Sequence, residues 1–468
     1  MKRIAMVVLL VLAASVAGAQ TEEELDRELL GDSASSDIQE EKNSWEINGF
    51  LRSSLQLALP FSADASEYEV VKLEGRGRLN TQYSSGTFSA KASVDAFYYP
   101  IQHFKDTFPR NRIEAAELYV AGGDRFQYKL GIQRFAWGNA EIFGVTGFFN
   151  RLDLSESLAK DPSDITRGVA ALSLKYIFGE LAVEAAWCPM QYPVIVPRGF
   201  WALKDHKPYE TEFIYNDSVR YDMTKSSAGA RVGGTMQGFD AFISYFNGYS
   251  SNVLINSTMI ETGSLTAGVI GYDEVKRESS LEYMRVNSIG LEFSRVIRKV
   301  TLRYESVVTP DMGAMKKVTD DDVDSVILAM SNDASDGELA SIDRVPYFAY
   351  TLGADWNIWG ANGMILLEWT QGLYLRDMTD YNYPALSYLM VIFLQDSFFD
   401  KRLTVRGGTV FRPIAILPGG LLSGEVAWKF MQNCELAFRG MFFFGNDDDL
   451  FEYFKNKDVI EVRMSYLF

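Results

Sequence analysis

The chain has few of the features that mark helical membrane proteins, metal sites or nucleic-acid binders. After residue 19 it has no uncharged apolar stretch of about 18 residues or more, the length that a helical span needs. The longest such run, near 386–394, is far too short. Only two histidines occur, His103 and His206, which argues against a histidine-rich metal site. The formal net charge of −17 argues against nucleic acid as a partner.

Cysteine is also scarce, and no recognisable catalytic motif is present. Cys188 and Cys434 lie far apart in the chain, so a disulfide is allowed in an oxidising compartment but not required. Two free thiols are the simpler interpretation. Nucleophilic catalysis needs a nucleophile beside a base, and neither histidine belongs to a Ser/His motif. We therefore predict no catalytic residue, no cofactor and no metal ligand, and we expect that the protein is not an enzyme.

The N-terminal 44 residues predict export. A basic start precedes an almost wholly apolar run at 4–16 and a small-x-small pattern at 17–19, which signal peptidase cleaves. Residues 1–19 are therefore predicted to form a cleavable signal peptide, with a buried N-terminal helix as the alternative. Residues 20–44 are acidic and have few large apolar side chains, which predicts a mobile periplasmic tail.

The last residues of the chain, 458–468, alternate between apolar and mostly polar side chains, as a strand with two different faces does. The final residue is aromatic. This ending resembles the terminal strand of bacterial outer-membrane proteins, whose last aromatic residue is read by the barrel-assembly machinery. Tyr466 and Phe468 are therefore predicted to form an assembly signal. A chance amphipathic strand at the end of a soluble β-protein is the alternative.

Residues 45–468 read as a series of paired strands. Aromatic residues make up 13% of the chain and the mean hydropathy is −0.07, a combination that alternating lipid-facing and water-facing residues produce. We predict about eighteen strands, with sixteen possible. Tight turns such as 84–86 and 179–180 alternate with long connections such as 138–166 and 191–225. The predicted fold is therefore all-β, a transmembrane antiparallel barrel with short periplasmic turns and long extracellular loops.

The predicted strands have one apolar face and one charged face. A charge on the lipid face near the midplane costs about 2–4 kcal/mol, so the charged face should point inward. Closing the barrel places the last strands beside the first and gathers basic residues on one wall. The predicted pore-lining residues are Arg52, Lys72, Arg76, Arg78, Arg402, Arg406, Arg439 and Arg463. Such a wall suits the passage or binding of anions, and a structural lattice of ion pairs is the alternative.

The connection 138–166 is unusually apolar for a loop, with residues such as Phe143, Phe148 and Phe149. A loop of this composition is not expected to remain in water, so we predict that it folds into the lumen and forms a constriction. The predicted constriction residues are Asp153, Glu156, Asp161 and Asp164. A solvent-exposed cap over the barrel mouth is the alternative.

The same region carries a family resemblance. Residues 131–138 read GIQRFAWG, and residues 150–154 read NRLDL. This resembles a group of largely uncharacterised, proteobacterial-type outer-membrane porins, in which a strand ending in Trp-Gly runs into a loop ending near Asn-Pro-x-Asp. Here Arg151 stands in place of the proline. The layout of the whole chain is also similar to that group. The resemblance implies a porin-like barrel and supplies neither catalytic residues nor a substrate.

These observations favour a porin or substrate-selective channel in a Gram-negative outer membrane, for small hydrophilic solutes and leaning toward anions. The alternative is an outer-membrane adhesin or structural barrel that acts through its extracellular loops. An outer-membrane enzyme is a third class, and it lacks a motif. The expected partners are outer-membrane lipid, the barrel-assembly machinery and the solutes. The solute, the oligomeric state and any gating stay open.

Overall fold

The computed structural model describes most of the chain from residue 43 onward. The predicted signal peptide, 1–19, and nearly all of the acidic tail, 20–44, lie outside the described residues. These are 43–59, 70–102, 111–156, 160–190, 192, 194–195, 199–201, 210–214, 223–250, 254–261, 275–316, 322, 325, 337–338, 342–358, 363–377, 381, 388–413, 419–445, 451, 454 and 457–468.

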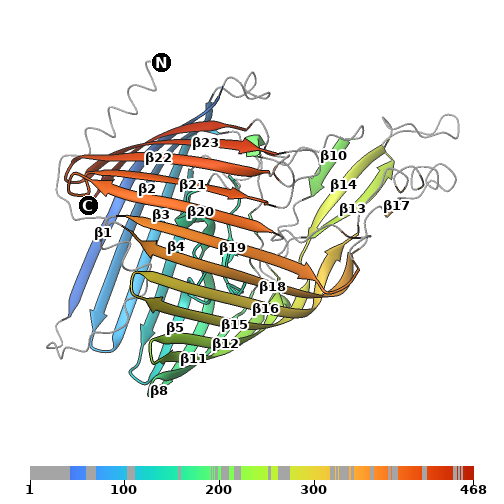
Figure 1. Cartoon of the computed structure of the whole chain (residues 1–468), viewed down its shortest axis with the longest axis horizontal. Helices are drawn as coiled ribbons and strands as arrows, with labels where there is room; N and C mark the ends of the chain where they lie inside the picture. Colours follow the sequence, from blue (N-terminus) through green and yellow to red (C-terminus); the bar gives the residue numbers. More distant parts are fainter. Residues whose placement is uncertain are drawn as a thin grey trace.

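Eighteen antiparallel strands form one closed sheet, as the sequence predicts (Figure 1). Closure occurs where β1 pairs with β24, with Phe50 opposite Leu467 and Ala58 opposite Val459. The barrel strands are β1 (Ser44–Ala58), β2 (Val70–Ser85), β3 (Phe88–Gln102), β4 (Asn111–Gly122), β5 (Phe126–Gln133), β8 (Val169–Phe178), β9 (Leu181–Cys188), β11 (Ser227–Met236), β12 (Phe239–Tyr249), β15 (Arg285–Ile297), β16 (Val300–Met315), β18 (Ile342–Asn357), β19 (Met364–Tyr374), β20 (Leu389–Phe398), β21 (Leu403–Phe411), β22 (Gly420–Met431), β23 (Cys434–Phe444) and β24 (Val459–Leu467).

The two faces of the barrel have opposite chemistry. Large apolar side chains stand exposed on the outer face, for example Ile113 at 78% and Ile289 at 57%. Charged side chains such as Asp95 and Glu305 point inward and are at most 1% exposed. An apolar outer surface of this extent is stable only against lipid, so the barrel is a transmembrane one. No helix of the described chain is long and apolar enough to cross a membrane.

Tight hairpins connect several neighbouring strands. Between β11 and β12 the turn residues Gln237 and Gly238 have φ of 53° and 77°. Two consecutive positive φ values match the right-handed twist of the strands, and glycine adopts the second without strain. This geometry fixes the register of the hairpin and therefore which side chains face the lumen.

Short elements outside the barrel wall complete the fold. A four-stranded sheet stands apart from the barrel wall (Figure 1), and it was not predicted from the sequence. Its strands are β10 (Glu210–Ile214), β14 (Val275–Glu282), β13 (Leu254–Glu261) and β17 (Gly337–Glu338). The remaining elements are β6 (Arg151–Leu152), α3 (Pro162–Ile165), β7 (Thr166–Arg167), η3 (Gly199–Trp201) and η5 (Met223–Lys225).

The strand expected to run to Trp137 ends earlier, at Gln133. Beyond it, Phe135 and Trp137 join the apolar interior instead of the wall. Asn150 makes this departure possible, because its side chain accepts a hydrogen bond from Phe135 N at 2.8 Å and donates one to Phe135 O at 2.7 Å. The expected Trp-Gly strand end is therefore wrong as a strand end, and its residues lie in the following loop.

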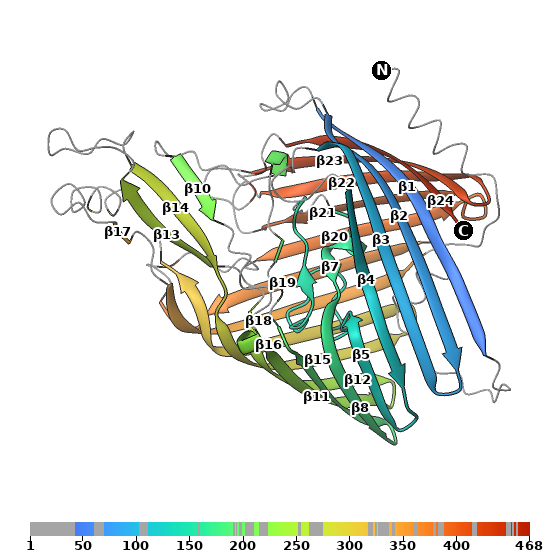
Figure 2. The ribbon, with the colours of Figure 1, turned by 180° about the vertical axis from the view of Figure 1, so that it is seen from behind.

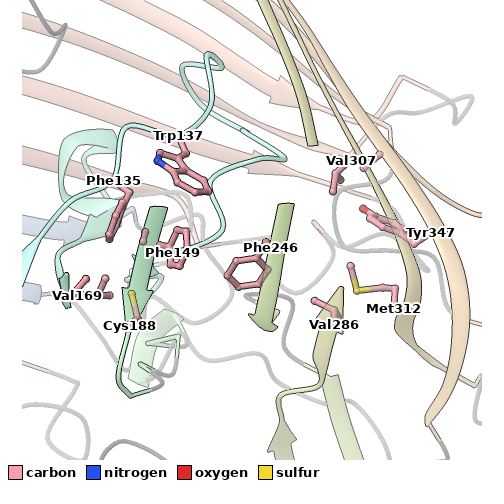
Figure 3. Close-up of a cluster of buried hydrophobic side chains, with 13 residues drawn as sticks. Phe135, Trp137, Phe149, Val169, Cys188, Phe246, Val286, Val307, Met312 and Tyr347 are labelled. Atoms are coloured by element: carbon pink, nitrogen blue, oxygen red, sulfur yellow. The ribbon is translucent and has the colours of Figure 1, made fainter. Parts of the chain in front are cut away.

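The interior of the barrel holds two clusters of buried apolar side chains. In the first cluster, the Phe149 ring packs edge to face against Trp137 and Phe246, with ring centres 5.0 and 5.2 Å apart (Figure 3). This cluster consists of Phe135, Trp137, Phe149, Val169, Ala171, Ala186, Cys188, Phe246, Val286, Val307, Met312, Tyr347 and Ala349. The second consists of Val71, Phe200, Trp201, Leu389, Leu421, Met441, Phe443, Phe451, Phe454 and Val459. Both join loop residues to the barrel wall, so loops narrow the lumen.

Candidate functional site

The connection between β5 and β8, residues 134–168, lies inside the barrel, and we name it the lumen loop. It includes the predicted constriction loop 138–166. Figure 2 shows the segment that carries β7 within the ring of barrel strands. Phe149 packs in the first apolar cluster, and Phe143 packs against the second. The apolar residues of the loop therefore find their partners in the interior.

Glu305 on β16 holds the first part of the lumen loop. Its carboxylate accepts backbone N–H bonds from Asn139, from Ala140 at 2.5 Å, from Val145 at 2.9 Å and from Thr146 at 3.2 Å. The Thr146 hydroxyl donates a further bond at 2.9 Å. The carboxylate is 1% exposed, so its charge is neutralised by aligned amide dipoles instead of a basic side chain.

Glu368 on β19 holds the next residues in the same way. Its carboxylate accepts N–H bonds from Glu141 at 2.9 Å, Ile142 at 3.3 Å and Phe143 at 2.6 Å. The Thr351 hydroxyl donates to Phe143 O at 2.8 Å. Two buried carboxylates on neighbouring parts of the wall therefore fix one edge of the lumen loop through its backbone.

The other edge of the lumen loop meets the opposite wall through ion pairs. We name the residues Arg52, Lys72, Arg76, Arg439 and Arg463 the basic wall; they lie on β1, β2, β23 and β24. The ion pairs across this contact are Arg76–Asp164 at 2.5 Å, Lys72–Glu156 at 2.8 Å and Arg463–Asp161 at 3.3 Å. The loop thus spans the lumen from the Glu305 and Glu368 side to the basic wall.

Asp153 organises the lumen loop internally. It is fully buried and pairs with Lys160 at 2.7 Å and with Arg167 at 2.9 Å. Burial alone would raise the pKa of the Asp153 carboxyl, but these two cations lower it well below its usual value. Likewise, burial would raise the pKa of Asp164, and the charge and hydrogen bonds of Arg76 lower it. Both loop carboxylates are therefore ionised at neutral pH.

A polar cavity of about 50 Å³ lies between the basic wall and the lumen loop. The five basic-wall residues line it, together with Glu156, Asp161 and Asp164 from the loop. The wall side also contains Glu74 and Glu461, and the loop side also contains Lys160 and Arg167, so cations are in excess on the wall and carboxylates are in excess on the loop. Such an arrangement produces a transverse electric field that acts strongly in a low-dielectric constriction.

Three of the predicted pore-lining arginines lie outside this cavity. Arg78 is partly buried and pairs with Asp95 at 2.7 Å. Arg406 is half-buried and lies 3.7 Å from Glu425. Arg402 is exposed in the turn that precedes β21, so it is not part of a strand as expected. The remaining five predicted basic residues and three of the four predicted loop carboxylates are brought together, while Asp153 lies behind them.

Sequence reasoning placed Glu305 on the inward face of its strand but missed the anchoring role of Glu305 and Glu368. Both occupy inward positions of their strands, so alternation places them in the lumen. Their partners are backbone amides, which have no sequence signature. Within the described residues no group of three or more His, Cys, Asp or Glu side chains could hold a metal ion. Cys188 and Cys434 are both free and buried.

The predicted assembly signal lies at the closure seam. Phe468 exchanges two backbone hydrogen bonds with Gly49, at 2.8 and 3.0 Å. Its ring stacks with Tyr466, with the ring centres 6.4 Å apart. A Cβ atom at Gly49 would lie 2.8 Å from the Phe468 ring, so the glycine leaves room for this aromatic side chain.

The chain is similar to solved outer-membrane proteins at low sequence identity. A Salmonella typhi OmpF in complex with daunomycin is 8% identical with a TM-score of 0.44, over 91% of this chain and 98% of that chain. OmpT, an outer membrane protein of Vibrio cholerae, is 9% identical with a TM-score of 0.37, over 92% and 99%. A mutant of the Rh. blastica porin is 11% identical with a TM-score of 0.39, over 91% and 100%. No protein-family model and no curated protein matches the chain. The fold described above therefore stands on its own strand pairing.

Proposed function

We propose that the protein is an outer-membrane channel of the porin type for small hydrophilic solutes. The observation that carries the proposal is the lumen loop, which is held across the barrel by Glu305 and Glu368 on one side and by the basic wall on the other. A barrel of this strand number is wide enough for water, and an inward loop restricts what passes. The two apolar clusters narrow the lumen further, which favours small solutes.

A mild preference for anions follows from the charges of the proposed constriction. Arg52, Lys72, Arg76, Arg439 and Arg463 face the lumen, and loop carboxylates neutralise part of this charge. A fully neutralised wall would give no preference, and an unopposed wall would give a strong one. Partial neutralisation therefore supports weak anion selectivity.

Single-channel recording of the refolded full chain in a planar bilayer tests the proposed function. We expect discrete conductance steps in potassium chloride and a reversal potential in a salt gradient that indicates a modest excess of anion flux. Folding is checked by the anomalous gel migration of unboiled protein. Folded protein that inserts and produces no steps would overturn the proposal.

We infer a channel and not an enzyme. What supports this is that ion pairs join the described part of the lumen loop to the basic wall, as in a constriction. His103 and His206 both lie outside the described residues. We also propose that the barrel-assembly machinery inserts the chain and reads Tyr466 and Phe468, which stand at the end of the closing strand.

Adhesion or structural support through the loops is a second candidate. The four-stranded sheet formed by β10, β14, β13 and β17, apart from the barrel wall, favours it. Replacing residues 251–283 by a short linker would remove two of its strands. If the sheet is the functional part, cell attachment is lost and conductance is kept. If attachment is unchanged, this candidate fails.

A further inference from the structure

Three arginines meet where β1 joins its two neighbours. Arg52 on β1 lies opposite Arg76 on β2 and, on its other side, opposite Ser465 on β24. Arg463 lies two residues before Ser465 in the sequence, so it stands on the same face of β24. Like charges on neighbouring strands destabilise a sheet unless acceptors neutralise them. Each of these guanidinium groups therefore needs an acceptor.

Two of the three arginines have carboxylate acceptors supplied by the protein. Arg76 pairs with Asp164 at 2.5 Å, and Arg463 pairs with Glu425 at 2.9 Å. Both guanidinium groups are therefore neutralised at close range, with geometry typical of strong charge-assisted hydrogen bonds.

Arg52 is different. Its Nε donates a hydrogen bond to Ser465 Oγ at 3.3 Å, and its guanidinium carbon lies 4.7 Å from the centre of the Phe50 ring. Among the residues that the structure describes, no carboxylate lies within ion-pair distance of Arg52. Asp161 and Asp164 act on Arg52 only from beyond ion-pair distance, and they are paired with Arg463 and Arg76. A partly buried guanidinium whose nearest carboxylates are engaged by other cations is costly for the fold. A positive group kept at that cost is expected to have a ligand.

The cavity beside Arg52 contains a second polar group without a partner. The Ser54 hydroxyl lines the cavity and is 2% exposed, and its oxygen has no hydrogen-bond partner among the described residues. Buried hydroxyl groups are almost always hydrogen-bonded. Glu461 lines the cavity as well, four residues along β24 from Ser465 and therefore roughly 13 Å from the level of Arg52. It is too distant to serve as the missing acceptor.

We propose that Arg52 and Ser54 form a binding site for a compact oxyanion, such as a phosphate or carboxylate group, on the path of the permeating solute. This inference rests on the proposed channel function and names the substrate class. The Arg52 guanidinium offers a planar pair of donors that matches two oxygens of such an anion, and Ser54 supplies a third donor. The cavity of about 50 Å³ has room for a few waters, and so for a compact anion and not for a sugar.

The loop carboxylates Asp161 and Asp164 keep this site weak. Both line the same cavity, and both are engaged by arginines of the basic wall. Their negative charge opposes tight anion binding, while Arg52 attracts the anion. In a channel, a binding site must attract the solute strongly enough that it enters and bind it weakly enough that it leaves. The arrangement therefore suits passage and not storage.

Block of chloride current in planar bilayers tests the site. Inorganic phosphate, succinate and acetate are titrated separately against the full-length protein in potassium chloride. We expect at least one of them to reduce the chloride current saturably. Arg52→Gln should raise the half-blocking concentration at least about tenfold, since hydrogen bonds to charged groups are among the strong ones. Ser54→Ala should raise it by roughly threefold, as loss of one neutral donor does. Arg402→Gln, at an exposed arginine in a turn, should change nothing.

Calorimetric titration of the same anions into the refolded protein in detergent provides a readout that does not depend on current. Binding that requires Arg52 in a protein without conductance would support the site and overturn the channel. Conductance without binding of any of the three anions would overturn the site alone, as would equal block of the wild type and Arg52→Gln. Arg52→Lys keeps the charge and loses the planar pair of donors, so its affinity for the anion should lie between those of the wild type and Arg52→Gln. It replaces Arg52→Gln if that variant does not fold.

Discussion

At the scale of single residues, the carboxylates of the lumen loop are held ionised by specific cations. Asp164 receives two hydrogen bonds from Arg76, at 2.5 and 2.9 Å, and Asp153 receives charge from Lys160 and Arg167. Desolvation raises the pKa of both carboxyls and so works against their ionisation. The neighbouring cations lower the pKa by more, so the pKa of each carboxyl lies below its usual value. A carboxyl whose pKa is lower in the folded state stabilises that state above its unfolded pKa.

This linkage gives a pH prediction for Asp164→Asn. The wild type should unfold at a higher temperature than the variant, and the difference should stay constant from pH 7 down to about 4. Below about pH 4 the difference should shrink, because Asp164 then binds a proton in the unfolded state while it stays ionised in the folded state, and this favours unfolding. Thermal unfolding followed by circular dichroism in detergent measures it. A difference that shrinks already between pH 7 and 5 would contradict the lowered pKa.

Gly49 gives a steric prediction at the closure seam. A Cβ atom there would lie 2.1 Å from the carbonyl oxygen of Arg78 on β2 and 2.8 Å from the Phe468 ring, so Gly49→Ala pushes β1 away from β2 and from the aromatic end of the chain. We expect a loss of about 1–3 kcal/mol, measured as a lower urea midpoint in detergent. Gly424→Ala is the matched control, because nothing lies within 4 Å of its Cβ position. Equal midpoints for both variants would show that the neighbouring strands adjust without loss of stability.

Alternation along the strands predicted which charged residues face the lumen, but not which partners they have. Arg76 and Arg78 were expected inside and are found there, both beside Asp95. The anchoring role of Glu305 and Glu368 was missed because they bind backbone amides, whose positions depend on the path of a loop. Arg402 follows the same parity as Arg406 but lies in a turn, since a strand end cannot be fixed by alternation alone. The roles of these residues in a pore stay predictions.

At the scale of elements, the lumen loop is the part of the chain on which the proposed function depends. Its backbone N–H groups are held by Glu305 and Glu368 on one side of the lumen, and its carboxylates are held by the basic wall on the other. Its apolar composition predicted contact with the interior. The early end of β5 was not predicted, because it depends on one amide side chain, Asn150, that replaces strand hydrogen bonds. The sheet of β10, β14, β13 and β17 was missed because its strands lack clear alternation and lie within connections expected to be loops.

Replacing the two anchors should loosen the lumen loop. Glu305→Gln and Glu368→Gln put an NH₂ group where backbone N–H groups now converge, and each removes about 1.5–3 kcal/mol of charge-assisted hydrogen bonding. We expect the double variant to show noisier current and a conductance raised roughly twofold, because the loop leaves the lumen part of the time. Asp240→Asn is the control, since the Asp240 carboxylate accepts hydrogen bonds from the hydroxyl groups of Thr235 and Ser294, which both lie on barrel strands and not in the lumen loop. Unchanged noise in the double variant would contradict the anchoring role.

The terminal strand β24 carries a prediction about assembly. Phe468 exchanges backbone hydrogen bonds with Gly49 as the barrel closes. Deleting Phe468 should lower the amount of folded protein in the outer membrane several-fold, whereas Phe468→Tyr, which keeps an aromatic end, should assemble normally. Quantification in membrane fractions from expressing cells measures both. Equal amounts of the deletion variant and the wild type would show that the aromatic end is not read.

At the scale of the whole molecule, barrel closure decides the distribution of charge. The eighteen strands were predictable because each face meets a different solvent, lipid outside and water or packed loops inside, and alternation records this. Closure brings β23 and β24 beside β1 and β2, so arginines from the two ends of the sequence share one wall. The lumen loop then sets carboxylates against that wall. The net charge that a solute would encounter depends on the arginines of the wall and the carboxylates of the loop together.

Replacing Arg76 and Arg78 by serine tests this balance. Both arginines pair with Asp95, and Arg76 also holds Asp164, so their loss removes two positive charges and leaves Asp164, which lines the constriction, without its closest partner. The reversal potential in a salt gradient should therefore shift toward cations. The shift should be larger than that of Arg402→Ser, which removes an exposed charge in a turn. Screening confines the influence of such exposed charges to about 8 Å at physiological salt, so the constriction should dominate. A wild type that is strongly cation-selective, or a double variant with an unchanged reversal potential, would mean that the arginines serve only as a structural lattice.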